Sequence, residues 1–221
     1  MFDLSYKNTD FHSHLIPKLD DGSQSYEESR ELLIMMLKKG ITDLFLTPHF
    51  NRPRFPYEIE YVKNKYEEFR EYFRDIDINF HLGAEIFLTN EITDKKLPTM
   101  GNSNILMLEL SFENKQPFLF EVIDGLIHKG YSIMIAHVER YDYFYMHRKT
   151  LFRDRVELGS DFFHLRKRGV LFQVNWSEIK KNSKKYNLLK ENGMIDFIGS
   201  DKHRLNDGRP VIDFSSGYSK E

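Results

Sequence analysis

The sequence predicts a parallel α/β fold in which seven strands close into a barrel. Short apolar runs rich in Ile, Leu, Phe and Val alternate with charged segments of helical periodicity along the chain. Polar, ligand-type side chains follow at least six of the seven runs. Alternation alone would also allow an open doubly wound sheet. Only closure brings six strand ends around one centre, so the pattern favours the barrel.

The predicted strands are short and strongly apolar. Runs such as ILMLEL and SIMIAH are continuous rather than alternating, which is typical of strands buried on both faces. The expected strands are Asp10–His12, Asp43–Thr47, Ile78–Gly83, Asn104–Leu110, Ser132–Ala136, Val170–Val174 and Ile195–Ile198.

Amphipathic segments between these runs predict the helices. The clearest begins at Ser25, which forms a capping box with Glu28, and stops at Gly40. Three further helices are expected at Tyr57–Arg74, Pro117–His128 and Leu188–Asn192, the last of which Gly193 ends.

Length and composition predict a single domain over residues 1–221, with residues from about 206 to 221 as a short C-terminal tail. Lys and Arg number 32 and Asp and Glu 34, so the net charge of −2 predicts no nucleic-acid partner. No secretory signal and no apolar stretch long enough for membrane insertion are recognised. Cysteine is absent, which excludes a thiolate nucleophile and agrees with a cytoplasmic location.

Residues that commonly bind metals follow the strands. His12 and His14 lie two apart after the first strand, and Asp201 and His203 repeat this spacing after the last. Residues two apart in a strand point the same way, so each pair can chelate one ion. The candidate ligands are His12, His14, Asp21, His49, Glu85, Glu109, His137, Asp201 and His203.

Each candidate also has an ordinary structural interpretation. His12 and His14 could be solvated in a turn, and Asp21 could belong to a plain Asp-Gly turn. Glu85 and Glu109 could form salt bridges, while His49 and His137 could be hydrogen-bonded inside the core. Five imidazoles and four carboxylates together favour Mn, Fe or Zn over Ca or Mg, and they suffice for two or three ions.

Such a metal cluster can activate water and neutralise phosphoryl oxygens, which suits phosphate hydrolysis. Arg140, three residues after His137, could clamp two phosphoryl oxygens, or it could pair with Glu139 at the surface. Arg209 is a second candidate in a Gly/Pro turn, although a solvated loop charge would look the same. If the departing oxygen needs a proton, His203 or water could supply it.

Taken in order, the motifs identify a known family. The sequence DFHSHLIPKLDDGSQSYEES, followed by TPHF, GAEI, LELS, IAHVERY, QVNWSEI and IGSDKHR, resembles the bacterial PHP-type phosphatases. Within that superfamily it is most similar to the manganese-dependent protein-tyrosine phosphatases of capsule and exopolysaccharide operons. The resemblance extends from about Thr9 to His203 and implies a distorted (β/α)7 barrel of the PHP type, similar to a TIM barrel.

The resemblance also implies roles for individual residues. Three manganese sites are implied: His12, His14 and Asp201 with Glu85; Glu85, Glu109 and His137; and Asp21, His49 and His203. Arg140 matches the family's phosphate-binding arginine, and Arg209 resembles a second one. The implied substrate is the phosphotyrosine tail of a bacterial tyrosine autokinase that controls polysaccharide synthesis.

Two departures from the family's pattern bear on these roles. The chain has little sequence after the last ligands, which leaves helix packing and a homo-oligomer open. The loop from Arg204 to Arg209 is one residue longer than the family's loop, which makes Arg209 a less secure assignment than Arg140.

Three other functions share parts of this pattern. A small-molecule phosphatase of the histidinol-phosphatase kind would use the same ions, and the pocket mouth would decide the substrate. The loop beside His49 could form an aromatic and basic rim, with Phe50, Arg52, Phe55 and Tyr57. An amidohydrolase would need a mid-barrel carbamylated Lys or His where this chain has Glu85 and Glu109. A non-catalytic metal-binding module is the third alternative.

Overall fold

Parallel strands form the centre of the fold in the computed structural model, which describes residues 7–149 and 154–216. All seven predicted strands are present within two residues of their expected bounds. They are β1 (Thr9–Ser13), β2 (Asp43–Leu46), β4 (Asn79–Leu82), β6 (Ile105–Glu109), β7 (Ser132–Ile135), β10 (Leu171–Asn175) and β11 (Phe197–Gly199). The predicted tail is described as far as Ser216, and residues 217–221 lie outside the described part.

Two additional short strands extend the predicted ones toward the functional end. β3 (His49–Phe50) follows β2 after Thr47-Pro48, and β5 (Glu85–Phe87) follows β4 after Gly83-Ala84. The strand orders are β1-β2-β4 and β11-β10-β7-β6-β5-β3, and every pairing within them is parallel. The sequence did not predict these breaks, which occur at Pro48 and Gly83.

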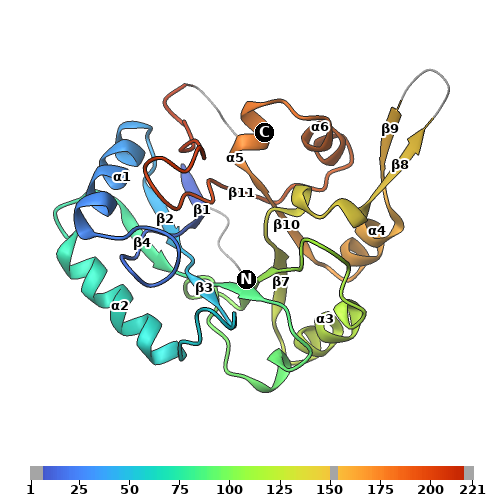
Figure 1. Ribbon diagram of the computed structural model, residues 1–221, viewed down its shortest axis with the longest axis horizontal. Coiled ribbons are helices and arrows are strands. Elements are labelled where there is room, and N and C mark those ends of the chain that lie inside the picture. The colour runs from blue at the N-terminus through green and yellow to red at the C-terminus, as the bar shows by residue number, and fades with distance from the viewer. Residues whose placement is uncertain (1–6, 150–153, 217–221) are drawn as a thin grey trace.

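The two sheet edges meet where β1 lies beside β11. Ser13 forms a parallel bridge with Lys202. The backbone N–H of His14 donates to the carbonyl of Lys202 over 2.8 Å, and the N–H of Asp201 donates to the carbonyl of His12 over 2.8 Å. The sheet therefore curls around on itself, as the predicted distorted barrel requires (Figure 1).

Helices cover the outside of the curled sheet (Figure 1). They are α1 (Tyr26–Lys38), α2 (Ile59–Tyr72), α3 (Leu119–His128), α4 (Ser160–Lys167), α5 (Trp176–Lys180) and α6 (Lys184–Glu191). Ser25 caps α1 by accepting from the N–H of Glu28 over 3.2 Å, as predicted. The carboxylate of Glu28 accepts from the N–H of Gln24, not from that of Ser25, so the capping box is not reciprocal.

Some elements were not expected from the sequence. α4 was missed, and α6 begins at Lys184 after the cap residue Ser183, four residues before the expected start. An antiparallel hairpin of β8 (Tyr145–Lys149) and β9 (Asp154–Leu158) extends outward from the body of the molecule (Figure 1). These segments are polar and lack a clear apolar period, so the sequence pattern does not predict their secondary structure.

The barrel interior holds a small apolar cluster beneath the polar end. Its buried members are Phe45, Met100, Ile105, Met107, Met134, Ala136 and Phe197. On β6, Ile105 and Met107 belong to this cluster, while Leu106 and Leu108 belong to the larger core. Successive side chains of a strand point to opposite faces, so Glu109 continues the interior row of Ile105 and Met107. A buried carboxylate is thereby placed on top of an apolar floor.

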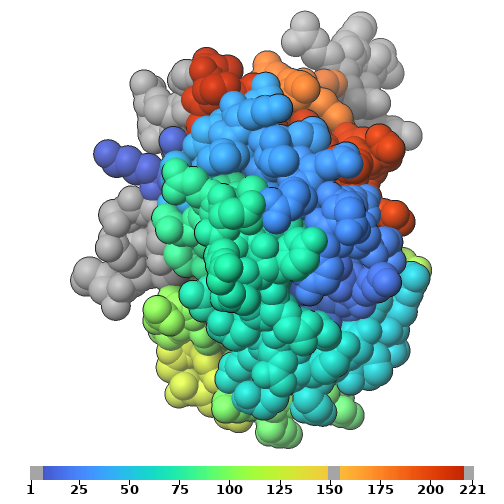
Figure 2. Space-filling model, turned by 90° about the vertical axis from the view of Figure 1, so that its left-hand side faces the viewer, coloured from blue at the N-terminus to red at the C-terminus, as the bar shows by residue number. Residues whose placement is uncertain are grey.

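α1 and α2 lie next to each other and form one surface of the molecule (Figure 2). The rings of Tyr26 and Tyr72 are 4.3 Å apart, and Arg30 forms an ion pair with Asp75 at 2.6 Å.

Among the described residues, no helix combines the length and the apolar composition that crossing a bilayer demands.

Gly199 permits the close approach of β11 to β1. A Cβ atom at this position would lie 2.4 Å from Cβ of His12 and 3.0 Å from Nε2 of Gln173. We expect Gly199→Ala to lower the free energy of unfolding by about 1–3 kcal/mol, because the two strands must separate. Urea unfolding measures this loss.

Gly125→Ala in α3 is the matched control, since its Cβ would meet only the methyl of Thr93 at 3.4 Å. That change should leave stability equal or raise it by about 0.5–1 kcal/mol, as Ala is the better helix former. Equal stability of Gly199→Ala and the unchanged protein would contradict the role assigned to Gly199.

Candidate metal centre

All nine predicted ligand residues gather at one end of the barrel. They lie on or directly after β1, β3, β5, β6, β7 and β11, and Asp21 lies in the loop that follows β1. Eight are buried, while the side chain of Asp21 is 43% exposed. Their ligand atoms form four groups, each with all atoms within 4.8 Å of one another: His14, Asp21, His49 and His203; His12, Glu85 and His137; His12, His14 and Asp201; and His49, Glu85 and Glu109.

Glu85 lies at the centre of this arrangement. Its Oε2 is 3.5 Å from Nε2 of His12, 3.4 Å from Nε2 of His14 and 2.9 Å from Nδ1 of His49. Its Oε1 is 2.6 Å from Nε2 of His137. Burial works to raise the pKa of this carboxyl, but the surrounding imidazoles hold it well below its usual range. Glu85 is therefore a buried anion facing four imidazole rings.

One observation indicates that these residues can bind divalent cations. Oε2 of Glu85 and Nδ1 of His49 are buried and lie 2.9 Å apart, but they are not aligned as a hydrogen bond, and neither atom has another hydrogen-bond partner among the described residues. Buried polar atoms without partners are rare in proteins, and each needs an explanation. An ion between the carboxylate and the imidazoles would bond to both. The mixture of imidazole and carboxylate donors is one that Mn, Fe and Zn accept.

His12 and His14 are each oriented by a hydrogen bond at Nδ1, which directs Nε2 of both rings toward the centre of the cluster. Nδ1 of His12 lies 3.1 Å from Oε1 of Gln173, and Nδ1 of His14 lies 2.7 Å from Oδ2 of Asp20. Because an oxygen accepts from each Nδ1, both Nε2 atoms are left to act as ligands. Burial opposes protonation of His14, but the charge of Asp20 raises its pKa to about 9. Neither Gln173 nor Asp20 was expected from the sequence to have a role.

Gln173 and Asn175 connect three of the ligand residues from β10. Oε1 of Gln173 also accepts from the backbone N–H of His137 over 2.7 Å, and its Nε2 donates to Oδ1 of Asn175 over 2.9 Å. Nδ2 of Asn175 donates in turn to Oδ2 of Asp201 over 3.1 Å. The only available signal was two polar residues, two apart, inside an apolar strand.

Asp21, His49 and His203 form the most exposed part of the cluster. Oδ1 of Asp21 is 3.3 Å from Nε2 of His49 and 3.5 Å from Nε2 of His203. The close contacts with the His203 and His49 imidazoles hold the pKa of Asp21 far below its usual range. Burial works against protonation of His49, but Glu85, Asp21 and Asp20 together raise its pKa to about 11.

His203 is oriented by its own loop. Its Nδ1 lies 2.9 Å from the backbone carbonyl of Asp201, which fixes Nδ1 as the donor and leaves Nε2 facing Asp21. Burial and the adjacent His14 lower the pKa of His203, so the neutral ring is favoured. The arrangement suits a ligand better than a proton donor.

Glu109 lies in a candidate metal-ligand group and also forms a salt bridge, the two possibilities that the sequence left open. It shares a ligand group with His49 and Glu85, and it also pairs with Arg52. Nε of Arg52 donates to Oε2 of Glu109 over 2.8 Å, and Nη2 contacts the other oxygen. Burial and the charge of Glu85 raise the pKa of Glu109. Arg52 was expected only at the rim, so its contact with a candidate ligand was missed.

Two arginines from different segments meet at one carboxylate oxygen. Nη1 of Arg140 is 3.4 Å and Nε of Arg209 is 3.5 Å from Oδ2 of Asp201. Their side chains are 40% and 31% exposed, so both remain accessible to solvent. Glu139 is buried and accepts from the N–H of Asn175, so the expected alternative of a surface pair between Arg140 and Glu139 does not apply.

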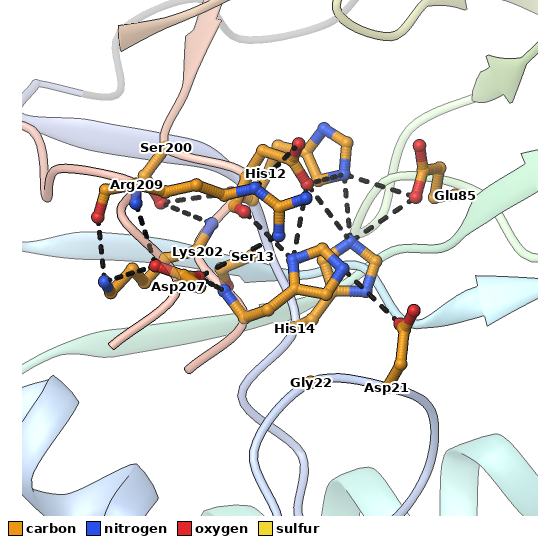
Figure 3. A network of polar contacts seen from close by, with 12 residues as sticks. His12, Ser13, His14, Asp21, Gly22, Glu85, Ser200, Lys202, Asp207 and Arg209 are labelled. Atoms are coloured by element: carbon orange, nitrogen blue, oxygen red, sulfur yellow. Dashed lines mark hydrogen bonds and ion pairs between the residues drawn. The ribbon is translucent and has the colours of Figure 1, made fainter. Parts of the chain in front are cut away.

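The loop that carries Arg209 is fixed by an internal ion pair. Nζ of Lys202 is bonded to Oδ1 of Asp207 at 2.7 Å and to the carbonyl of Arg209 at 2.8 Å. The carboxylate of Asp207 also accepts from the N–H groups of His203, Arg204 and Arg209. Figure 3 shows Arg209 directed from this loop toward His14 and the neighbouring ligands. Arg209 is therefore a positioned side chain, not a free loop charge.

Replacing Gln173 tests the orientation of His12. We expect Gln173→Leu to weaken manganese binding about 10- to 100-fold, because Nδ1 of His12 loses its acceptor. Competition with a chelating indicator measures the affinity. Gln173→Glu keeps an acceptor oxygen and should retain more affinity, while thermal unfolding without metal checks that each variant folds. Unchanged manganese affinity of Gln173→Leu would show that Gln173 does not orient the ligand.

Known proteins are similar to this chain over nearly its whole length. Tyrosine-protein phosphatase CpsB of Streptococcus pneumoniae is 26% identical over 211 residues, which cover 91% of this chain and 84% of the relative. Tyrosine-protein phosphatase YwqE of Bacillus subtilis is 26% identical over 207 residues, or 89% and 77% of the two chains.

The fold is also that of a solved structure. Crystal structures described as those of YwqE from Bacillus subtilis and CpsB from Streptococcus pneumoniae, metal-dependent tyrosine phosphatases, include a chain that superposes with a TM-score of 0.77 at 24% identity. The superposition covers 92% of this chain and 83% of that one. The sequence profile described as "Capsular polysaccharide synthesis, CpsB/CapC" matches residues 8–220. The chain therefore belongs to the CpsB/CapC family of capsular polysaccharide synthesis.

Proposed function

We propose that this protein is a metal-dependent phosphatase that hydrolyses phosphotyrosine in a protein substrate. One observation carries the proposal: nine ligand-type side chains, with Glu85 at their centre, form one cluster, and two arginines reach the edge of that cluster at Asp201. Cations and guanidinium groups side by side form a site for a dianionic phosphoryl group. The tyrosine-phosphatase names of the relatives support the same activity.

We propose three metal positions, as the family resemblance implies, with Mn as the first choice and Fe or Zn as alternatives. His12, His14 and Asp201 are proposed for the first, beside Glu85. Asp21, His49 and His203 are proposed for the third, and the ligand group that contains them also includes His14.

The second position is proposed to use Glu85 with Glu109 and His137. Glu85 shares one ligand group with Glu109 and another with His137, so it is the residue best placed to bridge two ions. Arg52 must share Glu109 with that ion or release one of its oxygens.

The chain's own residues supply substrate binding. Arg140 and Arg209 are placed to bind phosphoryl oxygens on the side of Asp201 that faces solvent. When bound, divalent ions activate water and neutralise phosphoryl charge, so no protein nucleophile is needed. Tyrosinate leaves readily because its conjugate acid has a pKa of about 10. We therefore assign His203 as a ligand and leave protonation of the departing oxygen to water.

We further propose that the substrate is the phosphotyrosine tail of a tyrosine autokinase that regulates capsular or exopolysaccharide synthesis. The family's role in capsular polysaccharide synthesis supports this partner. We also propose a cytoplasmic location, with which a chain without cysteine is compatible.

The alternatives receive less support from the geometry. Amidohydrolases commonly use a carbamylated Lys or a His in mid-barrel, where this chain has Glu85 and Glu109. The buried Lys202 is bonded instead to Asp207 and to the carbonyls of Leu205 and Arg209. A non-catalytic module would not need two partly exposed arginines at the ligand cluster. A small-molecule phosphatase remains the rival, and substrate preference decides between it and the proposal.

Metal removal and return test the catalytic role of the cluster. We expect chelation to abolish hydrolysis of a phosphotyrosine peptide and added manganese to restore it. His137→Ala should stay at least about 100-fold less active after manganese return, because Glu85 loses a partner. Initial rates measure both effects.

His128→Ala is the matched control, because this histidine is exposed at the end of α3 and bonds only the carbonyl of Asp124. It should behave as the unchanged protein does. Equal activity of His137→Ala and the unchanged protein would remove the central hypothesis. Faster hydrolysis of histidinol phosphate than of the peptide would favour the small-molecule alternative.

Arg140 is proposed to bind the phosphoryl group through both guanidinium nitrogens. We expect Arg140→Ala to lower kcat/KM about 100-fold, and Arg140→Lys to restore only part of the loss, since a lysine cannot form the paired hydrogen bonds. Steady-state kinetics on the manganese-loaded enzyme measure this. Arg74→Ala, at an exposed surface ion pair with Glu71, should have no effect. Full activity of Arg140→Ala would disprove the assignment.

A further inference from the structure

Phe112 is an exposed aromatic ring beside the proposed phosphate site. It lies three residues after Glu109, and 39% of its surface is exposed. Its ring centre is 5.5 Å from that of His137, and the guanidinium carbon of Arg140 lies 4.2 Å from the same centre. A large apolar side chain therefore borders the charged and polar groups of the site.

Packing does not account for the position of this ring. Neither of the two apolar core clusters contains Phe112. Its other aromatic neighbour is Tyr141, whose ring is stacked at 5.5 Å and is itself buried. Single exposed apolar residues are common, so exposure alone means little. The location of Phe112 against both His137 and Arg140 is what indicates a ligand contact.

A second aromatic residue near the cluster is less available. Phe55 stacks on the ring of His49 at 5.6 Å, but only 9% of its surface is exposed. Phe55 therefore serves mainly to pack His49. Of these two rings, Phe112 is the one that a ligand can reach.

We propose that Phe112 forms an aryl-binding subsite that contacts the phenyl ring of phosphotyrosine and gives the enzyme its preference for aryl over alkyl phosphates. The proposal rests on the phosphatase function proposed above. Only one oxygen separates the tyrosyl ring from phosphorus, so a phosphoryl group bound by Arg140 brings the ring next to Phe112. Aromatic rings attract each other in offset or edge-to-face contacts. A phosphoserine side chain offers no ring for that contact.

A different role for Phe112 predicts a different result. If the ring only held Arg140 in place through its cation–π contact, its loss would weaken every phosphate ester equally. An aryl subsite, in contrast, affects only ligands that carry an aromatic ring. Comparison of aryl with alkyl ligands on the same variant therefore separates the two roles.

Binding of two non-hydrolysable phosphonates provides the test. Calorimetry measures the dissociation constants of phenylphosphonate and methylphosphonate on the manganese-loaded protein, which requires no activity. Steady-state kinetics give kcat/KM on peptides that differ only in phosphotyrosine or phosphoserine. We expect Phe112→Leu to weaken phenylphosphonate about 2- to 10-fold and to leave methylphosphonate unchanged. Hydrolysis of the phosphotyrosine peptide should fall by a similar factor, and Phe112→Tyr should keep the preference.

Phe163→Leu is the matched control, because Phe163 is 51% exposed on α4, away from the ligand cluster. It should change neither dissociation constant. Equal weakening of both phosphonates by Phe112→Leu would overturn the aryl subsite and leave Phe112 as a support for Arg140. No weakening of either would also overturn it. Absence of phosphate-ester hydrolysis by the unchanged protein would instead overturn the proposed function, while the phosphonate constants would still decide the subsite.

Discussion

The whole functional end of this protein depends on one buried carboxylate. Glu85 faces His12 and His14 at the end of β1, His49 on β3 and His137 after β7, three segments that are far apart in the sequence. A buried anion is costly unless cations or donors surround it, so this carboxylate is stable only when those strand ends converge. Glu85 thus links the closure of the barrel to the chemistry at its end. The apolar cluster below it, with Phe45 and Met107, excludes water from the other side.

Barrel closure and ligand placement use the same short contacts. Where β1 meets β11, backbone hydrogen bonds join His12 to Asp201 and His14 to Lys202. Asp10, which is buried, accepts from the N–H of Ser200 over 2.8 Å and strengthens the same seam. Ligands from the first and last strands therefore reach each other because the sheet closes. An open sheet would separate them by its full width.

Periodicity and ligand chemistry were sufficient to predict the seven strands, four of the helices and the convergence of the nine ligand-type residues. They were insufficient for side chains whose role depends on a partner elsewhere in the chain. Gln173 and Asn175 look like two polar residues in a strand until His12, His137 and Asp201 are placed around them. Arg52 gave no sign of its bond to Glu109, and the hairpin of β8 and β9 lacks the apolar period that identifies a buried strand.

Asp201 faces two competing kinds of positive charge. Its Oδ1 lies toward His12 and His14, and its Oδ2 lies between Arg140 and Arg209. A cation near Oδ1 draws the negative charge of the carboxylate toward that oxygen. Less negative charge then remains on Oδ2 to pair with the two guanidinium groups. A cation bound near Oδ1 of Asp201 would therefore leave Arg140 and Arg209 more positive toward an anion. The two oxygens of this one side chain couple the two binding events, and the backbone does not have to change.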